Sequence, residues 1–247
     1  MKKINMLMVT RNEADRYLQS CLTYHSKFFD NIIIVDDSST DDTEKICLDF
    51  TSKVFRRPES VPGFADHEGR FREFAWTKLE PYTDEGDWVL VVDADEFFVS
   101  HSSLLELRES LQVYIAHADA LKRDLITMNV HEVWQHDIVP YKRMDGFWNS
   151  GVCFRFVKYL GNMPFLDKSM GSHSVPKHYL NLPKTGISLC SMLHLGYLDD
   201  QDKEDKFNRY MAMEGHGHNK KHISSITTQP SLVELHGSIP KYWRGVR

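Results

Sequence analysis

Short apolar runs alternate with polar segments through the first half of the chain. The runs are rich in β-branched side chains, the pattern of parallel strands buried on both faces, and they predict strands at residues 4–9, 31–35, 52–55 and 88–92. Apolar side chains at helical spacing predict helices over residues 14–22, 71–78 and 104–115. This alternation predicts an α/β fold, with a mostly parallel sheet and helices on both of its faces.

Polar residues mark where two helices should begin, one of them not predicted by spacing alone. Asp41 is placed to cap the helix after the second strand, and Glu44 completes a pattern similar to a capping box. Ser103 and Glu106 are placed to cap the helix that carries Leu104.

The alternation fades beyond about residue 124. Residues 127–193 mix strand-like pieces with glycine, proline and aromatic residues, and only residues 199–214 return to helical spacing. We therefore expect one domain over residues 1–247, in which residues 1–123 form a nucleotide-binding half and residues 124–247 form an acceptor-binding half with a C-terminal helix and tail.

Composition narrows the class of protein. The 247 residues are 41% hydrophobic and 26% charged, as in ordinary globular proteins, and the net charge of −5 disfavours a whole-surface attraction to nucleic acid or anionic lipid. No apolar run reaches 18 residues, so we expect no transmembrane segment, a cytoplasmic location and at most peripheral membrane contact. The four cysteines are widely spaced, which favours reduced thiols.

Polar clusters follow three of the predicted strands directly, at residues 10–13, 36–41 and 93–96. Because the carboxyl ends of parallel strands line one crevice, where ligands bind in open α/β sheets, these clusters should converge. Asp93 and Asp95 flank one small residue, so in an extended segment their carboxylates point the same way and repel unless a cation neutralises them. Mg²⁺ or Mn²⁺, shared with substrate phosphates, suits such hard oxygen ligands.

An isolated Asp-x-Asp is usually explained by a turn or a helix cap. Here the segment directly follows a buried strand, which favours a metal site. Asp36 and Asp37 have a similar alternative, as loop-forming residues. Their functional interpretation is that one accepts the N–H of a nucleotide base with a uracil-like edge.

Several ordered segments together resemble the family 2 glycosyltransferases, and most of all a small bacterial and phage branch with an Asp-Ala-Asp-Glu motif. They are Thr-Arg-Asn-Glu at 10–13, the Asp- and Ser-rich stretch at 35–43, Arg-Glu-Phe-Ala at 72–75 and the segment at 87–96. His194-Leu-Gly-Tyr197, followed by Lys206 and Arg209, is similar to a late segment of that branch. The likeness covers residues 4–98 well and 190–214 moderately.

The resemblance implies a GT-A (Rossmann-like) fold and a nucleoside-diphosphate-sugar donor with Mn²⁺ or Mg²⁺. Our leading hypothesis is the transfer of a hexose or pentose from a UDP-linked donor to an acceptor hydroxyl, with inversion, in a bacterial or phage-infected cytoplasm. The resemblance assigns the metal to Asp93, Asp95 and His194. His194 ligates the metal if neutral and stabilises the leaving diphosphate if protonated. The nucleotide-sugar residues that it implies are Thr10, Asn12, Glu13, Asp36, Asp37, Arg72, Asp93, Ala94, Lys206 and Arg209. For Lys206 and Arg209 the alternative is a solvated helix face.

The catalytic base is where this chain departs from the family pattern. Gly151 stands where an aspartate often precedes the arginine of an Arg155-like segment, and Ser174, not glutamate, follows His173. Inversion needs a carboxylate near the acceptor hydroxyl. The candidates are Asp145, Asp167 and Glu132, each also explicable as structural; if none serves, a retaining mechanism becomes conceivable.

The acceptor stays open between a glycan, a small molecule, a protein and a modified DNA base, and a non-catalytic nucleotide-sugar-binding protein is the main alternative to an enzyme. The histidines at 216, 218 and 222 are better explained by a polar loop, able to close over the donor, than by a zinc site. Aromatic residues that could contact an acceptor or a polyanion, but that core packing or a loose tail explains as well, are Trp134, Trp148, Trp243 and the tail at 241–247.

Overall fold

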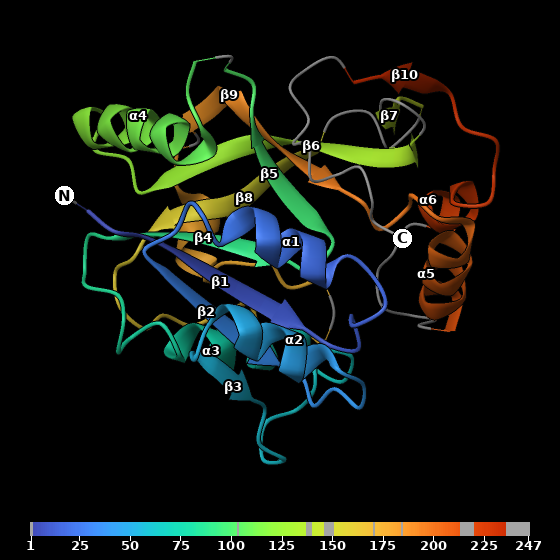
Figure 1. The fold of residues 1–247 in the computed structure, drawn as a ribbon, viewed down its shortest axis with the longest axis horizontal. Helices are drawn as coiled ribbons and strands as arrows, with labels where there is room; N and C mark the ends of the chain where they lie inside the picture. Colours follow the sequence, from blue (N-terminus) through green and yellow to red (C-terminus); the bar gives the residue numbers. More distant parts are fainter. Residues whose placement is uncertain are drawn as a thin grey trace.

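A computed structural model describes residues 2–102, 104–136, 140–145, 151–169, 171–183, 185–212 and 220–235 (Figure 1). The strands are β1 Ile4–Thr10, β2 Asn31–Asp36, β3 Val54–Arg56, β4 Trp88–Asp93, β5 Glu96–Ser100, β6 Leu125–His136, β7 Pro140–Arg143, β8 Gly151–Lys158, β9 Thr185–His194 and β10 Leu232–Glu234. The helices are α1 Leu18–His25, α2 Thr43–Phe50, α3 Glu68–Thr77, α4 Leu107–Ala120, η2 Lys177–Asn181, α5 Asp200–Ala212 and α6 Lys220–Ser225.

The first half of the chain forms the parallel part of the sheet. Strand β1 lies between β4 and β2, and β3 follows β2 at the edge, with all four strands parallel. The four predicted strands are confirmed, each to within two residues at either end. Their apolar runs reflect burial on both faces, since β1 is buried along its whole length.

The second half continues the same sheet rather than leaving it. Strand β8 pairs antiparallel with β4, β6 pairs antiparallel with β8, and β9 pairs parallel with β6 and antiparallel with β5. Register shifts interrupt β6 between Ile126 and Met128 and between Val133 and Gln135. Such irregularities shift the two-residue alternation of side chains, which explains why no clean period is visible there.

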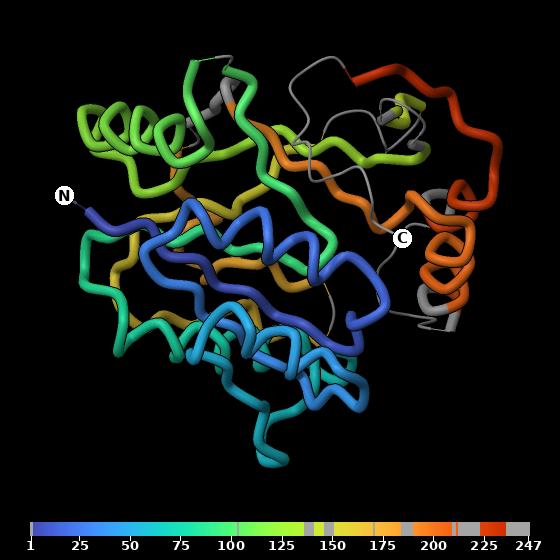
Figure 2. The backbone as a smooth tube through the Cα atoms, viewed as in Figure 1, coloured from blue at the N-terminus to red at the C-terminus, as the bar shows by residue number. Residues whose placement is uncertain are grey.

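Helices cover both faces of the sheet, as predicted. Side chains of α1, α2 and α4 pack in one apolar cluster with Met6 and Met8 of β1. Side chains of α3 and η2 pack in a second cluster with Leu7 and Val9, which alternate with those methionines along the strand. The backbone tube shows the resulting layers (Figure 2). The α/β class with a mostly parallel core is therefore confirmed.

Of the two predicted helix caps, Glu106 is confirmed as the N-cap of α4, whereas Asp41 as the cap of α2 is wrong. Helix α4 begins at Leu107, where the backbone N–H of Glu106 donates to Glu109 at 2.9 Å, and Leu104 lies outside it with 89% of its surface exposed. Ser103 lies outside the described residues. Helix α2 follows Asp42, which makes no side-chain cap.

The predicted partnership of Asp41 with Glu44 does not form. Asp41 accepts the backbone N–H groups of Ala14 and Thr43 instead. Glu44 reaches across to Arg56 of the edge strand at 2.8 Å, so a tertiary ion pair replaces the local capping box.

Among the described residues, the helices are too short or too polar for any of them to cross a bilayer.

Helix α3 depends on a close backbone approach at Gly69. A Cβ there would lie 2.0 Å from the carbonyl oxygen of Leu166, so Gly69→Ala must push the 166–168 segment away from the helix. We expect a loss of about 2 kcal/mol in the free energy of unfolding, measured by urea denaturation. Gly151→Ala is the matched control, because its Cβ would meet Val130 at an ordinary 3.7 Å. Equal stability of the two variants would contradict the packing described here.

Candidate active site

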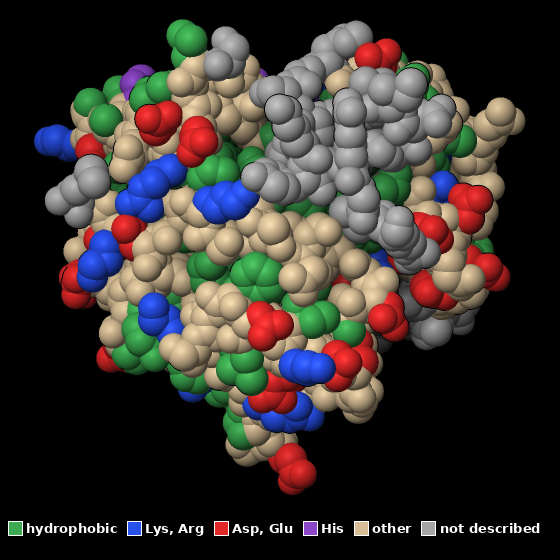
Figure 3. Space-filling model, in the orientation of Figure 1, with side chains coloured by type: hydrophobic (Ala, Val, Ile, Leu, Met, Phe, Trp, Pro, Cys, Tyr) green, Lys and Arg blue, Asp and Glu red, His purple; other side chains and the backbone are tan. Residues whose placement is uncertain are grey.

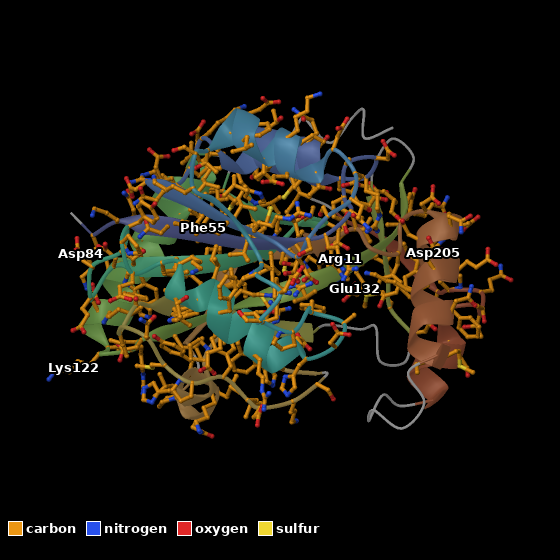
Figure 4. The ribbon with its side chains drawn as sticks, turned by 90° about the horizontal axis from the view of Figure 1, so that it is seen from below. Arg11, Phe55, Asp84, Lys122, Glu132 and Asp205 are labelled. Atoms are coloured by element: carbon orange, nitrogen blue, oxygen red, sulfur yellow. The ribbon has the colours of Figure 1, made fainter. Side chains whose placement is uncertain are left out.

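The polar clusters after the parallel strands meet at one edge of the sheet. Thr10 lies in register with Asp36, Val9 lies in register with Asp93, and the backbone N–H of Asp37 donates to the carbonyl oxygen of Thr10 at 2.9 Å. In the side-chain view, Arg11 and Glu132 both lie toward the end of the molecule that carries α5, whereas Asp84 and Lys122 lie toward the opposite end (Figure 4). The predicted convergence is confirmed.

The loops after β1 and β2 are tied to each other. Asn12 has a left-handed backbone, with φ of 52°; its N–H donates to the hydroxyl of Ser39 and its side-chain oxygen accepts the N–H of Thr40, both at 2.9 Å. The N–H of Glu13 donates to the hydroxyl of Thr43 at 2.7 Å. Asn12 therefore holds the shape of the edge, a task that asparagine suits because it tolerates this backbone region.

Asp36 and Asp37 are almost fully buried, and their carboxylates already have partners. Asp36 accepts the backbone N–H and the hydroxyl of Ser39, the local turn that its sequence context allows. Asp37 accepts the N–H of Phe64 at 3.0 Å and pairs with Arg57 and, at 3.4 Å, with Arg11. Their assignment to base recognition stays a prediction.

Asp93 ends β4, and residues 94–95 form a turn. The expected extended geometry of the Asp-Ala-Asp segment is therefore wrong, although both carboxylates still reach the same edge. Asp93 Oδ2 lies 2.9 Å from Arg155 Nη2, and Asp95 Oδ2 lies 3.3 Å from His194 Nε2 and 3.5 Å from Lys206 Nζ. Side chains of the protein itself supply positive charge to both, so repulsion alone does not demand a metal. Ala94 is buried and leaves room for the turn.

Arg155 is the cation at the centre of the cluster. It comes from β8, which runs antiparallel to β4, so its first half lies at the edge where β4 ends. Its Nη2 also lies 2.5 Å from Glu96 Oε1, and Glu96 Oε2 accepts the backbone N–H of Asp93 at 2.8 Å. Burial would raise the pKa of Asp93, but Arg155 and Arg72 lower it; burial and the neighbouring Asp93 raise that of Glu96.

His194 is held from both sides. It lies in register with Glu96 on β5 and with Glu132 on β6, and its Nδ1 is 2.5 Å from Glu132 Oε2. Burial alone would lower its pKa, but Glu132 and Asp95 raise it to about 10. The imidazolium then donates from Nδ1 to Glu132 and from Nε2 to Asp95. Lys206 Nζ, 3.1 Å from Nε2, is then a second cation that faces the same Asp95 carboxylate.

Gly196 makes this convergence possible. A Cβ at this position would lie 1.8 Å from Lys206 Nζ, 2.6 Å from Asp95 Oδ2 and 2.8 Å from His194 Nε2. The three side chains thus meet directly over the backbone of residue 196, where only a hydrogen fits.

Buried polar atoms without a hydrogen-bond partner concentrate at this edge. Arg72 binds Glu68 through Nε at 2.8 Å, but its Nη1 only approaches Asp93 Oδ1, at 3.9 Å. The atoms of this kind at the edge are Thr10 Oγ1, Glu13 Oε2, Arg72 Nη1, Asp93 Oδ1 and Arg155 Nη1. Because buried polar groups are normally satisfied, such a group of atoms indicates a polar ligand.

The donor set fits a divalent cation beside phosphates. Carboxylate oxygens are hard ligands for Mg²⁺ or Mn²⁺, and guanidinium N–H groups are good donors to phosphate. No preformed group of three or more His, Cys, Asp or Glu ligands occurs in the described parts of the chain, so the assignment of a metal to Asp93, Asp95 and His194 stays a prediction.

The three candidate bases are placed very differently. Glu132 contacts the cluster through His194. Asp145 pairs with Arg143 through both carboxylate oxygens at 2.8 and 2.7 Å, which lowers its pKa to about 2. Asp167 is 73% exposed and pairs with His67 and Arg70 on the α3 side. Of the three, only Glu132 contacts the cluster in the described structure.

Lys206 is buried at the site, whereas Lys203 pairs with Asp200 and faces the ring of Trp134. Trp134 stacks on Tyr197 with ring centres 5.0 Å apart, which favours its interpretation as a core residue. The side chains of Arg209 and His222, together with residues 216, 218, 148 and 241–247, lie outside what the structure describes.

Sequence reasoning gave no role to Arg155, Arg16 or Gly196. Arg155 and Gly196 were visible within family-like segments, whereas nothing in the local sequence distinguishes Arg16. The two arginines act on residues that are distant in the chain, and Gly196 acts by leaving space for other side chains. The spacing of residues in the sequence therefore does not predict their roles.

Residues 6–169 match the family model of glycosyl transferase family 2, which is two thirds of the chain. The chain belongs to this family. The family prediction made from the motifs is thereby confirmed, and the predicted enzyme class is that of the family.

Relatives and solved structures are more distant. Uncharacterized glycosyltransferases of Rickettsia felis and Rickettsia bellii are 28% and 26% identical over 49% and 60% of this chain, and the matches span 43% and 47% of those proteins. The chain therefore spans less than half the length of these curated relatives. S. aureus TarS 1–349 in complex with UDP has a TM-score of 0.46 at 17% identity, covering 92% of this chain and 69% of that one. Glucosyl-3-phosphoglycerate synthase from Mycobacterium tuberculosis, in complex with Mg²⁺ and UDP, has 0.34 at 20%, covering 54% and 44%. UDP is a ligand of TarS, and Mg²⁺ and UDP are ligands of the synthase.

Gly196→Ala tests the convergence of side chains. The added methyl group must displace Lys206, Asp95 and His194 together, so we expect Mn²⁺ binding, measured by electron paramagnetic resonance, to weaken at least about tenfold. Because the displaced groups are side-chain tips, the melting temperature should change little. Gly151→Ala is again the control, and unchanged Mn²⁺ affinity in Gly196→Ala would contradict the geometry of the cluster.

Proposed function

We propose that this protein transfers a sugar from a UDP-linked donor to an acceptor hydroxyl, with inversion and with the help of Mn²⁺ or Mg²⁺. The observation that carries the proposal is the set of partnerless buried atoms at the carboxyl edge, which offers carboxylate oxygens and guanidinium N–H groups side by side. A nucleoside diphosphate with a divalent cation presents the complementary groups. Membership of glycosyl transferase family 2 supports the same reaction class.

In this proposal Asp95 and Asp93 hold the cation. The bound cation would offset the negative charge of the leaving diphosphate. His194 lies beside Asp95 and is oriented by Glu132. As an imidazolium it suits a donor to phosphate, and it would ligate the metal only after losing its Nε2 proton. Lys206 approaches from α5 as a further cation for the diphosphate.

Arg72 and Arg155 each have a buried guanidinium nitrogen without a hydrogen-bond partner. Glu68 fixes Arg72, and Glu96 fixes Arg155, so both guanidinium groups are oriented before a ligand arrives. Preorganised cations of this kind stabilise negative charge that develops in a transition state. Thr10 and Glu13 offer a hydroxyl and a carboxylate oxygen for the donor.

The test is release of sugar across a panel of nucleotide-sugars, with Mn²⁺ and with chelator. We expect turnover of one UDP-linked donor that chelator abolishes, and a loss of about 100-fold or more in Asp95→Asn, which retains size but not charge. Metal-dependent binding without any turnover would favour a non-catalytic nucleotide-sugar-binding protein. Absence of both, in a folded protein, would contradict the proposal.

The carboxylates named as candidate bases allow a second test. Glu132→Gln keeps a hydrogen-bond acceptor for His194 but removes the charge, so we expect kcat to fall about tenfold or more. Asp167→Asn should leave kcat within about twofold, because its partners His67 and Arg70 lie on the α3 side. A large loss of kcat in Asp167→Asn, with the kcat of Glu132→Gln unchanged, would favour Asp167 over Glu132 as the catalytic base.

A further inference from the structure

Asp202 is a buried carboxylate in the first turn of α5, with 5% of its surface exposed. An acidic residue at this position normally lies in solvent, where it interacts with the helix dipole. Asp202 instead points into the protein, toward the loop after β1. Its Oδ1 lies 3.0 Å from Arg16 Nη2, and its Oδ2 accepts the hydroxyl of Tyr17 at 3.0 Å. The two carboxylate oxygens of Asp202 thus contact Arg16 and Tyr17, which lie 186 and 185 positions earlier in the chain.

Arg16 links this contact to the loop that offers Glu13. Its Nη1 donates to Glu13 Oε1 at 2.7 Å, whereas Glu13 Oε2 is one of the partnerless atoms of the site. One guanidinium group therefore contacts both the donor-side loop and α5. A planar arginine can serve two carboxylates in this way because its N–H groups point in fixed directions.

Lys206 lies on the same face of α5 as Asp202, four residues later. It is also buried, with its Nζ 3.5 Å from Asp95 Oδ2 and 4.4 Å from the centre of the Tyr197 ring. The side chain of lysine is long and flexible, so its place at the site depends on where the helix backbone is held. Asp205, by contrast, is exposed on the same helix and accepts from Gln201. Figure 3 shows that acidic and basic side chains lie interspersed over the exposed surface of one face of the molecule.

We propose that Asp202 is a positioning residue: by anchoring α5 to Arg16 and Tyr17, it places Lys206 beside Asp95. The inference rests on the proposed function only where it gives Lys206 a role toward the donor diphosphate. The anchoring itself is a property of the fold and is measurable without a substrate.

The first measurement is the rate at which an amine-reactive acetylating reagent modifies Lys206, followed by mass spectrometry. We expect Asp202→Asn to raise this rate about tenfold, because one anionic partner of Arg16 is lost and α5 is released. Asp205→Asn makes the same chemical change on the exposed side of the helix and should leave the rate unchanged. Equal rates in wild type and Asp202→Asn would overturn the inference. If Asp202→Asn fails to fold, Tyr17→Phe removes one hydrogen bond from the same carboxylate and should give a smaller rise.

The second measurement separates positioning from general stability. In kcat/KM for the donor, Asp202→Asn should cost about tenfold in the wild-type background but almost nothing when Lys206→Ala is already present. Additive losses would overturn the inference, since Asp202 would then act independently of Lys206. A wild-type protein without any turnover would contradict the proposed function, while the acetylation rates would still decide whether Asp202 anchors α5.

Discussion

The site depends on the balance of charge at the carboxyl edge of the sheet. Asp93, Asp95 and Glu96 fall within four residues and are all largely buried, an arrangement that is unfavourable without positive partners. Arg155 serves the first and the last of them, and His194 faces the middle one. Desolvation of so many charges makes them a poor source of stability, so their concentration here is best explained by function.

The positive partners come from elements far along the chain. Arg155 belongs to β8, His194 ends β9 and Lys206 belongs to α5, whereas the carboxylates follow β4. The second half of the chain therefore completes a site that the first half begins. The pairing of β9 with both β5 and β6 places His194 in register with Glu96 and with Glu132.

The parts that could be predicted from sequence are those that local patterns determine. Continuous apolar runs identify β1, β2 and β4, and the topology of parallel sheets brings the residues that follow them together. The ion pair of Glu44 with Arg56 could not be predicted, because a strand partner outcompetes the local cap. The roles of Arg155 and Gly196 could not be predicted for a related reason. The role of Arg155 depends on the antiparallel register of β8 with β4, and that of Gly196 depends on the space beside its Cα.

In the proposed function, the cations at the edge change partners when metal and diphosphate bind. In the structure, Arg155 pairs with Asp93 and Lys206 pairs with Asp95, so both cations lie at the same edge. In the proposed function a divalent cation takes over those carboxylate oxygens, so the guanidinium and ammonium groups become available to phosphate. The metal would then take the place of the protein's cations beside the carboxylates, and the diphosphate would take the place of the carboxylates beside those cations. Each ligand would therefore favour the binding of the other. In the proposed function, the Asp-Ala-Asp turn would therefore hold a metal–diphosphate pair more than a metal alone.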